Sequence, residues 1–100
     1  MWVPGKPRLY ETEAFRTALY WKTQGISEPP RQGPVTVKLR FVFHASNPRA
    51  AVPVNEPSLR GLINAALDTM CGVAWASERQ VMAVHAAKEY GNEAGTEVVW

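Results

Sequence analysis

An unbroken helical pattern of apolar residues between positions 59 and 70 is the feature that most constrains the fold of this chain. The pattern occupies Leu59, Leu62, Ile63, Ala66, Leu67 and Met70. Because spacings of three and four residues place side chains on one side of an α-helix, these positions predict a helix with one buried stripe. Asn55 is a candidate N-cap, Pro57 fits the first turn, and Gly72 lies where the chain would leave the helix. Such a helix needs a second layer on which to pack.

The alternating segment VTVKLRFVFH at 35–44 predicts a strand that supplies this second layer. One face of the strand is apolar at every second position from Val35 to Phe43. The other face carries Thr36, Lys38, Arg40 and His44. A strand with one apolar face and one polar face is typical of a sheet that is covered on one side.

The rest of the chain predicts a small α+β fold. A brief strand is expected around Trp2 and Val3, a helix over 12–24, a proline-rich connector over 26–34 and a loop over 45–55. Strands are expected over 80–90 and 95–100, with Gly91 and Asn92 in a hairpin connection between them. The pattern predicts a mostly antiparallel or mixed sheet of about four strands with two helices, in a single domain over residues 1–100.

The composition is that of a protein with a packed core. Apolar residues make up 46% of the chain and charged residues 20%, as in soluble globular proteins. Cys71 is the only cysteine, so no intramolecular disulfide can form, and we expect a reducing, cytoplasmic compartment. No apolar run reaches the length of about 18 residues that predicts a membrane helix, so we expect no membrane partner. The net charge of +2 permits contact with DNA through a local patch but does not require it.

Several side chains are candidates for binding. The basic residues that could form a phosphate-binding surface are Lys6, Arg8, Lys38, Arg40, Arg49, Arg60 and Lys88. An ordinary solvated face explains the same residues equally well. Trp21 lies off the apolar stripe of its predicted helix, which makes it a candidate interface residue. His44 and His85 could join Glu78 in a metal cluster, but isolated histidines on separate strands more often have no metal.

The segment LDTMCGVAWASERQV at 67–81 resembles the signature of the RusA family of Holliday junction resolvases. In that signature a helix reading D-x-D-N-L-x-K-A-x-x-D-A-L is followed by a small turn, an aromatic residue and a D-D-x-Q-V segment that opens a strand. The matching residues are Leu67, Asp68, Gly72, Trp75, Gln80 and Val81. The segments VPGKPR at 3–8 and PVTVKLRFVF at 34–43, and Lys88 with Tyr90, are also similar to the family.

The resemblance implies a dimeric enzyme of DNA recombination and repair that binds four-way DNA junctions. It also implies cleavage of phosphodiesters with magnesium held by aspartates, because magnesium prefers carboxylate, phosphate and water oxygens. An association with phages is a further implication of the resemblance.

The residues at the family's active-site positions depart from the signature. Ser58 and Arg60 stand where the family has its two aspartates, and Asn64 stands where it has the helix lysine. Of the acidic pair after the turn, Ser77 replaces the first residue and Glu78 retains the second. Arg60 places a fixed positive charge where a divalent cation would have to bind. We therefore expect no metal cofactor, or magnesium if the protein is active.

Three functions remain open from these residues. The first is a catalytically inactive RusA-fold protein that binds DNA, a junction or a protein partner. The second is an active magnesium-dependent, structure-selective endonuclease with a site rebuilt from Glu56 and Glu78, although Glu56 is more simply a favourable acid at a helix N-terminus. The third is a phage-type inhibitor of a host or defence protein, which the high tryptophan content would suit.

Overall fold

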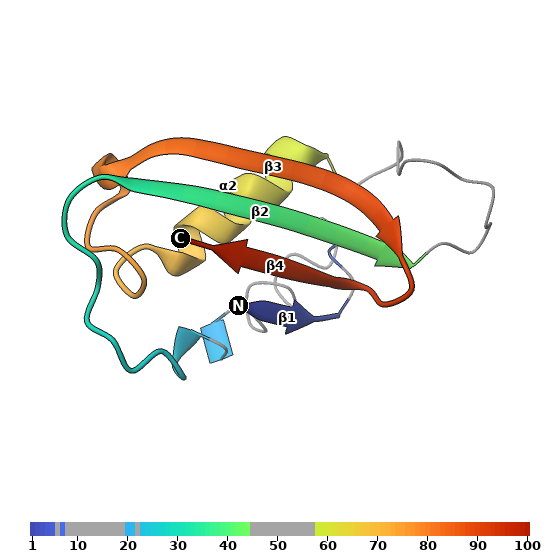
Figure 1. Ribbon diagram of the computed structural model, residues 1–100, viewed down its shortest axis with the longest axis horizontal. Helices are drawn as coiled ribbons and strands as arrows, with labels where there is room; N and C mark the ends of the chain where they lie inside the picture. Colours follow the sequence, from blue (N-terminus) through green and yellow to red (C-terminus); the bar gives the residue numbers. More distant parts are fainter. Residues whose placement is uncertain (6, 8–19, 22, 45–57) are drawn as a thin grey trace.

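The computed structural model describes residues 1–5, 7, 20–21, 23–44 and 58–100. Its elements are β1 (Trp2–Pro4), β2 (Val35–His44), α2 (Leu59–Met70), the 3-10 helix η1 (Glu78–Gln80), β3 (Val81–Gly91) and β4 (Gly95–Val99). The four strands form one mixed sheet, and α2 lies across one face of it (Figure 1). The predicted α+β class is confirmed.

The first predicted helix, over 12–24, falls mostly outside the described residues. Tyr20, Trp21 and Thr23 near its expected end are helical. In the part of the chain that the structure describes, no helix is long and apolar enough to cross a membrane.

The strand order is β1-β4-β2-β3. Strand β2 runs parallel to β3 along one edge and antiparallel to β4 along the other, so that Phe41 faces Lys88 on one side and Thr96 on the other. The parallel pairing follows from the helix between the two strands, because parallel neighbours need a long crossover connection. Strand β1 pairs antiparallel with β4 and completes the sheet.

The predicted hairpin between the last two strands is wrong. Strands β3 and β4 follow each other in the chain, but β2 lies between them in the sheet. The chain crosses the end of β2 closely, since a Cβ on Gly91 would lie 2.6 Å from Cγ1 of Val42. Glycine at this position leaves the space that the crossing needs, and the short connection therefore skips a strand instead of closing a hairpin.

The core lies between α2 and one face of the sheet. The apolar face of β2 is buried as predicted, with Val37 and Phe41 fully inaccessible to solvent. From the helix, Leu62, Ala66 and Met70 are buried against it. The predicted stripe is thus confirmed as the side of α2 that packs on the core.

The start of α2 differs from the prediction. Ser58, not Asn55, is the N-cap, because its side chain accepts a hydrogen bond of 3.2 Å from the backbone N–H of Gly61. The helix ends at Met70, and Gly72 has a positive φ of 86°, which suits glycine at the predicted exit. The first turn of the helix therefore begins later in the chain than the sequence indicated.

The opposite face of the sheet is not covered by α2, and we call it the open face. Strand alternation and register place on this face Trp2 from β1, Lys38 and Arg40 from β2, His85, Ala87 and Glu89 from β3, and Glu97 from β4. The polar side chains predicted to lie together on β2 are therefore joined by charged residues from both neighbouring strands.

Candidate functional site

The N-terminus of α2 holds the residues that stand at the family's two aspartates. Ser58 caps the helix, and Arg60 is its second residue and is exposed to solvent. The first turn of this helix contains no acidic residue. Because the N-terminal end of a helix carries a partial positive charge, Arg60 adds to a positive potential there instead of opposing it. Among the described residues of this first turn, the charged side chain is therefore a cation, that of Arg60.

The turn at η1 holds the residues that stand at the family's acidic pair. Ser77 is the N-cap of η1, and its Oγ accepts a hydrogen bond of 3.3 Å from the backbone N–H of Arg79. In return, Oε1 of Gln80 accepts a bond of 2.6 Å from the backbone N–H of Ser77, which completes a capping box. Glu78, the first residue of η1, is exposed.

Gln80 also ties η1 to the proline-rich connector. Its Nε2 donates hydrogen bonds of 2.7 Å to the carbonyl oxygen of Arg31 and 2.9 Å to that of Gly33. One amide group thus holds two segments that lie far apart in the chain. The role of Gln80 was missed in the sequence, although the Ser-x-x-Gln spacing of a capping box was visible at 77–80. The glutamine that matches the family signature has a structural role.

Replacing Gln80 by glutamate is expected to lower the free energy of unfolding by about 1–2 kcal/mol, because a carboxylate cannot donate to the two carbonyl oxygens. The exposed Gln32 in the same connector provides a matched control. Gln32→Glu adds the same charge and is expected to change stability by less than about 0.5 kcal/mol. Urea unfolding followed by circular dichroism measures both variants. Equal stabilities of Gln80→Glu and wild type would contradict this role.

The residues expected to share one site lie at opposite ends of α2 within one chain. Ser58 and Arg60 lie at the start of the helix, whereas Glu78 follows its far end and leads into β3. A helix of this length spans about 18 Å. In Figure 1 the start of α2 and the beginning of β3 lie toward opposite ends of the molecule. The structure therefore does not bring Glu78 to the N-terminus of α2.

The other metal candidates are also separated. His44 is at the C-terminal end of β2, paired with Gly91, whereas Glu78 precedes the opposite end of β3. Glu56 lies outside the described residues. Among residues that the structure describes, no group of three or more His, Cys, Asp or Glu side chains is placed to hold a metal ion.

The basic candidates are divided between two sides of the molecule. Lys38 and Arg40 are on the open face, whereas Lys88 is the register partner of the buried Phe41 and lies on the side of the sheet that α2 covers. The Nζ atom of Lys88 is 5.6 Å from the centroid of the Phe43 ring. Arg60 lies on the exposed side of α2, and Lys6, Arg8 and Arg49 fall outside the described residues. The four described basic candidates therefore do not share one face.

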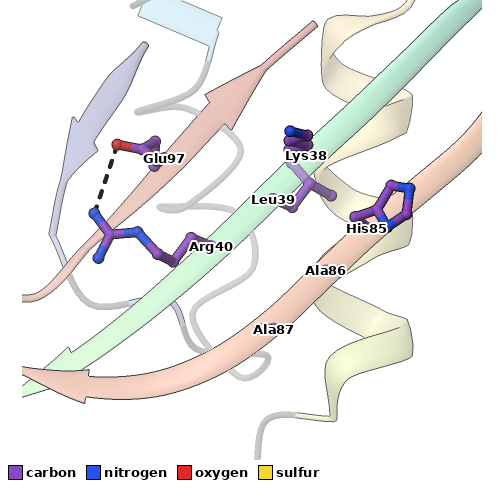
Figure 2. A pocket seen from close by; sticks show the side chains of 7 residues that line it. All are labelled: Lys38, Leu39, Arg40, His85, Ala86, Ala87 and Glu97. Atoms are coloured by element: carbon purple, nitrogen blue, oxygen red, sulfur yellow. Dashed lines mark ion pairs between the residues drawn. The ribbon is translucent and has the colours of Figure 1, made fainter.

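Arg40 is engaged by acidic neighbours on the open face. Its Nη1 lies 2.7 Å from Oε1 of Glu89 on β3, and its Nη2 lies 3.5 Å from Oε2 of Glu97 on β4. The guanidinium also lies 6.0 Å from the centroid of the Trp2 ring. The hydrogen bond with Glu89 raises the pKa of Arg40 above its ordinary value. The charge of Arg40 is thus balanced by two carboxylates (Figure 2 shows Glu97).

Trp21 is the most exposed of the large hydrophobic side chains in the described residues, at 69%. Its ring meets that of Tyr20 edge to face, with centroids 5.6 Å apart. Tyr20 is itself half exposed. These two rings form an aromatic pair on the surface, which keeps Trp21 as a candidate for contact with a partner.

Comparison with known proteins places these observations in a family. The model of the family described as Endodeoxyribonuclease RusA matches residues 1–99. No curated protein matches the chain. The family match includes both ends of α2 and all four strands of the sheet.

Proposed function

Because this chain belongs to the RusA family of endodeoxyribonucleases, we propose that it keeps the family's DNA-binding role and has lost the cleavage reaction. The fold is that of a Holliday junction resolvase. In this proposal the protein binds branched DNA without cutting it. It acts as a homodimer in the cytoplasm, and residues 1–100 form one domain. The observation that carries this proposal is the use made of two serines at the family's acidic positions.

Ser58 and Ser77 are both N-caps, of α2 and η1 respectively. Serine and aspartate are nearly equivalent as N-caps, because either side chain can accept a hydrogen bond from the first turn. Exchanging aspartate for serine at these positions keeps the start of each helix and removes a negative charge. These exchanges of aspartate for serine therefore preserve the fold but remove carboxylates that a metal site needs.

The described residues do not fit the magnesium that the family implies. Magnesium binds in proteins through carboxylate oxygens, and the corresponding positions hold two hydroxyl groups and the guanidinium of Arg60. Glu78 alone supplies one carboxylate. We derive no metal-dependent step from this arrangement.

A cleavage assay on a labelled four-way DNA junction tests the proposal. With magnesium or manganese, we expect a band shift from binding and no nicked product above background. Glu78→Ala should behave as wild type in this assay, as should Glu28→Ala, which removes an exposed glutamate elsewhere on the surface. Nicking by wild type that is abolished by Glu78→Ala and retained by Glu28→Ala would contradict the proposal and support the active endonuclease.

An active enzyme would need more than one chain. Since Glu78 and the N-terminus of α2 are at opposite ends of the helix, a site that combined Glu78 with residues at that N-terminus would require two copies of the chain. The proposed homodimer could meet this geometric condition, and the cleavage assay decides whether it does.

The exposed Tyr20 and Trp21 favour one other candidate function, an inhibitor that binds a host or defence protein. Aromatic side chains are enriched where proteins bind one another. This function predicts that the protein fails to shift junction DNA and that Trp21→Ala abolishes binding to the protein partner.

A further inference from the structure

The open face contains a depression of about 310 Å³ beside the middle of β2. The residues that line it include Lys38, Arg40, His85, Ala87 and Glu97 (Figure 2). On the open face of β3 the small side chain of Ala87 leaves space beside the longer side chains of Lys38 and Arg40 on β2. The depression is therefore formed by the contrast in side-chain size between two paired strands.

The two basic residues of β2 at this depression, Arg40 and Lys38, differ in their ion pairs. Arg40 donates a hydrogen bond to Glu89 and forms an ion pair with Glu97, so its charge already has two anionic partners (Figure 2 shows Glu97). Lys38 is exposed and forms no ion pair with any residue that the structure describes. Of these two residues, Lys38 is therefore the one whose positive charge is not balanced by a carboxylate among the described residues.

His85 lies beside Lys38. The two are register partners on the parallel strands β2 and β3, and both are exposed on the open face. An imidazole N–H and an ammonium group can donate hydrogen bonds to the same anion. This end of the depression is therefore lined by donors, and the end at Glu97 is lined by a carboxylate.

We propose that Lys38 and His85 form a contact for a backbone phosphate of DNA on the open face, and that Arg40 instead holds the sheet together. This inference rests on the proposed DNA binding and assigns part of it to a surface. A phosphate matches the donors at Lys38 and His85, whereas Glu89 and Glu97 repel the backbone from the Arg40 side. The contact positions DNA without reading its sequence.

The salt dependence of DNA binding separates Lys38 from Arg40. Fluorescence anisotropy with a labelled four-way junction would be measured between 50 and 200 mM salt for wild type, Lys38→Gln and Arg40→Gln, an experimental range chosen because phosphate contacts weaken strongly across it. Each phosphate contact contributes about 0.9 to the slope of log affinity against log salt concentration. We expect Lys38→Gln to reduce the slope by about that amount, and Arg40→Gln to leave it unchanged. His85→Gln should weaken binding less than Lys38→Gln, since it removes no permanent charge.

The possible results of this binding experiment test the phosphate contact, the division between Lys38 and Arg40, and the proposed DNA binding separately. Binding by wild type with equal slopes for wild type and Lys38→Gln overturns the phosphate contact and leaves the proposed DNA binding standing. An equal loss of slope in Arg40→Gln overturns the division between the two residues. The absence of DNA binding by folded wild type overturns the proposed function and this inference together. Circular dichroism of each variant checks that it is folded.

Discussion

Replacing Trp75 with alanine is expected to lower the free energy of unfolding by about 3–5 kcal/mol. Trp75 is 1% exposed and belongs to the core beneath the end of α2. Its main chain joins two segments, because its carbonyl oxygen accepts a hydrogen bond of 2.7 Å from the N–H of Gly72 and its neighbours bond to Arg31. A loss of this size is a large part of the 5–15 kcal/mol that stabilises a typical small domain.

Phenylalanine at position 75 is the informative control. The buried Nε1 of Trp75 has no hydrogen-bond partner in the described structure, so Trp75→Phe removes no bond and leaves only a smaller ring. We expect a loss of about 1–2 kcal/mol, well below that of alanine. Urea unfolding followed by circular dichroism measures both variants.

DNA binding by the same two variants tests the structural role of this aromatic residue. If Trp75 acts through the core, binding is lost only where folding is lost, and the phenylalanine variant binds as wild type does. Weak binding by a fully folded Trp75→Phe would instead make the aromatic residue a DNA contact, in conflict with its burial.

Replacing Gly95 with alanine is expected to lower the free energy of unfolding by about 1–3 kcal/mol, because the added methyl group overfills a packed space. A Cβ at this position would overlap the indole ring of Trp2 at Cζ2. Trp2 would have to leave its place over β4, where it lies beside Arg40. Alanine in a strand is otherwise more favourable than glycine, so the sign of the effect comes from this contact.

A double-mutant cycle isolates that contact. In the Trp2→Ala background the ring is absent, and Gly95→Ala should then be neutral or stabilising by up to about 1 kcal/mol. Chemical denaturation of the four proteins gives the coupling free energy. A Gly95→Ala cost that persists without the indole ring would show that the close approach to Trp2 is not its cause.

Much of the fold could be predicted from short stretches of sequence. The stripe at 59–70 and the alternation at 35–44 predicted α2 and the orientation of β2, because helix and strand periodicity are local properties of the chain. The same local reading failed at the last two strands. A short connection containing Gly91 predicted a hairpin, and only the pairing of β2 along both of its edges placed β3 and β4 apart.

The candidate site shows the same division. The sequence named Lys38 and Arg40 together, as neighbouring charges on one face, and could not show that Glu89 and Glu97 flank only Arg40. Those carboxylates come from strands that are distant in the chain. The sequence likewise placed Ser58 and Glu78 in one signature but did not show their distance in space. In the structure α2 lies between them, so they are at opposite ends of that helix.

The sequence by itself determined the class of the fold and the core side of α2 and β2, and it predicted departures from the family's acidic signature at Ser58, Arg60 and Ser77. These depend on residue type and spacing, which the chain carries without being folded. The tertiary structure alone decided the strand order, the pairing of Arg40 with two carboxylates, and the space beside Lys38 and His85. These depend on which strands become neighbours, and that choice is made by packing across the whole sheet.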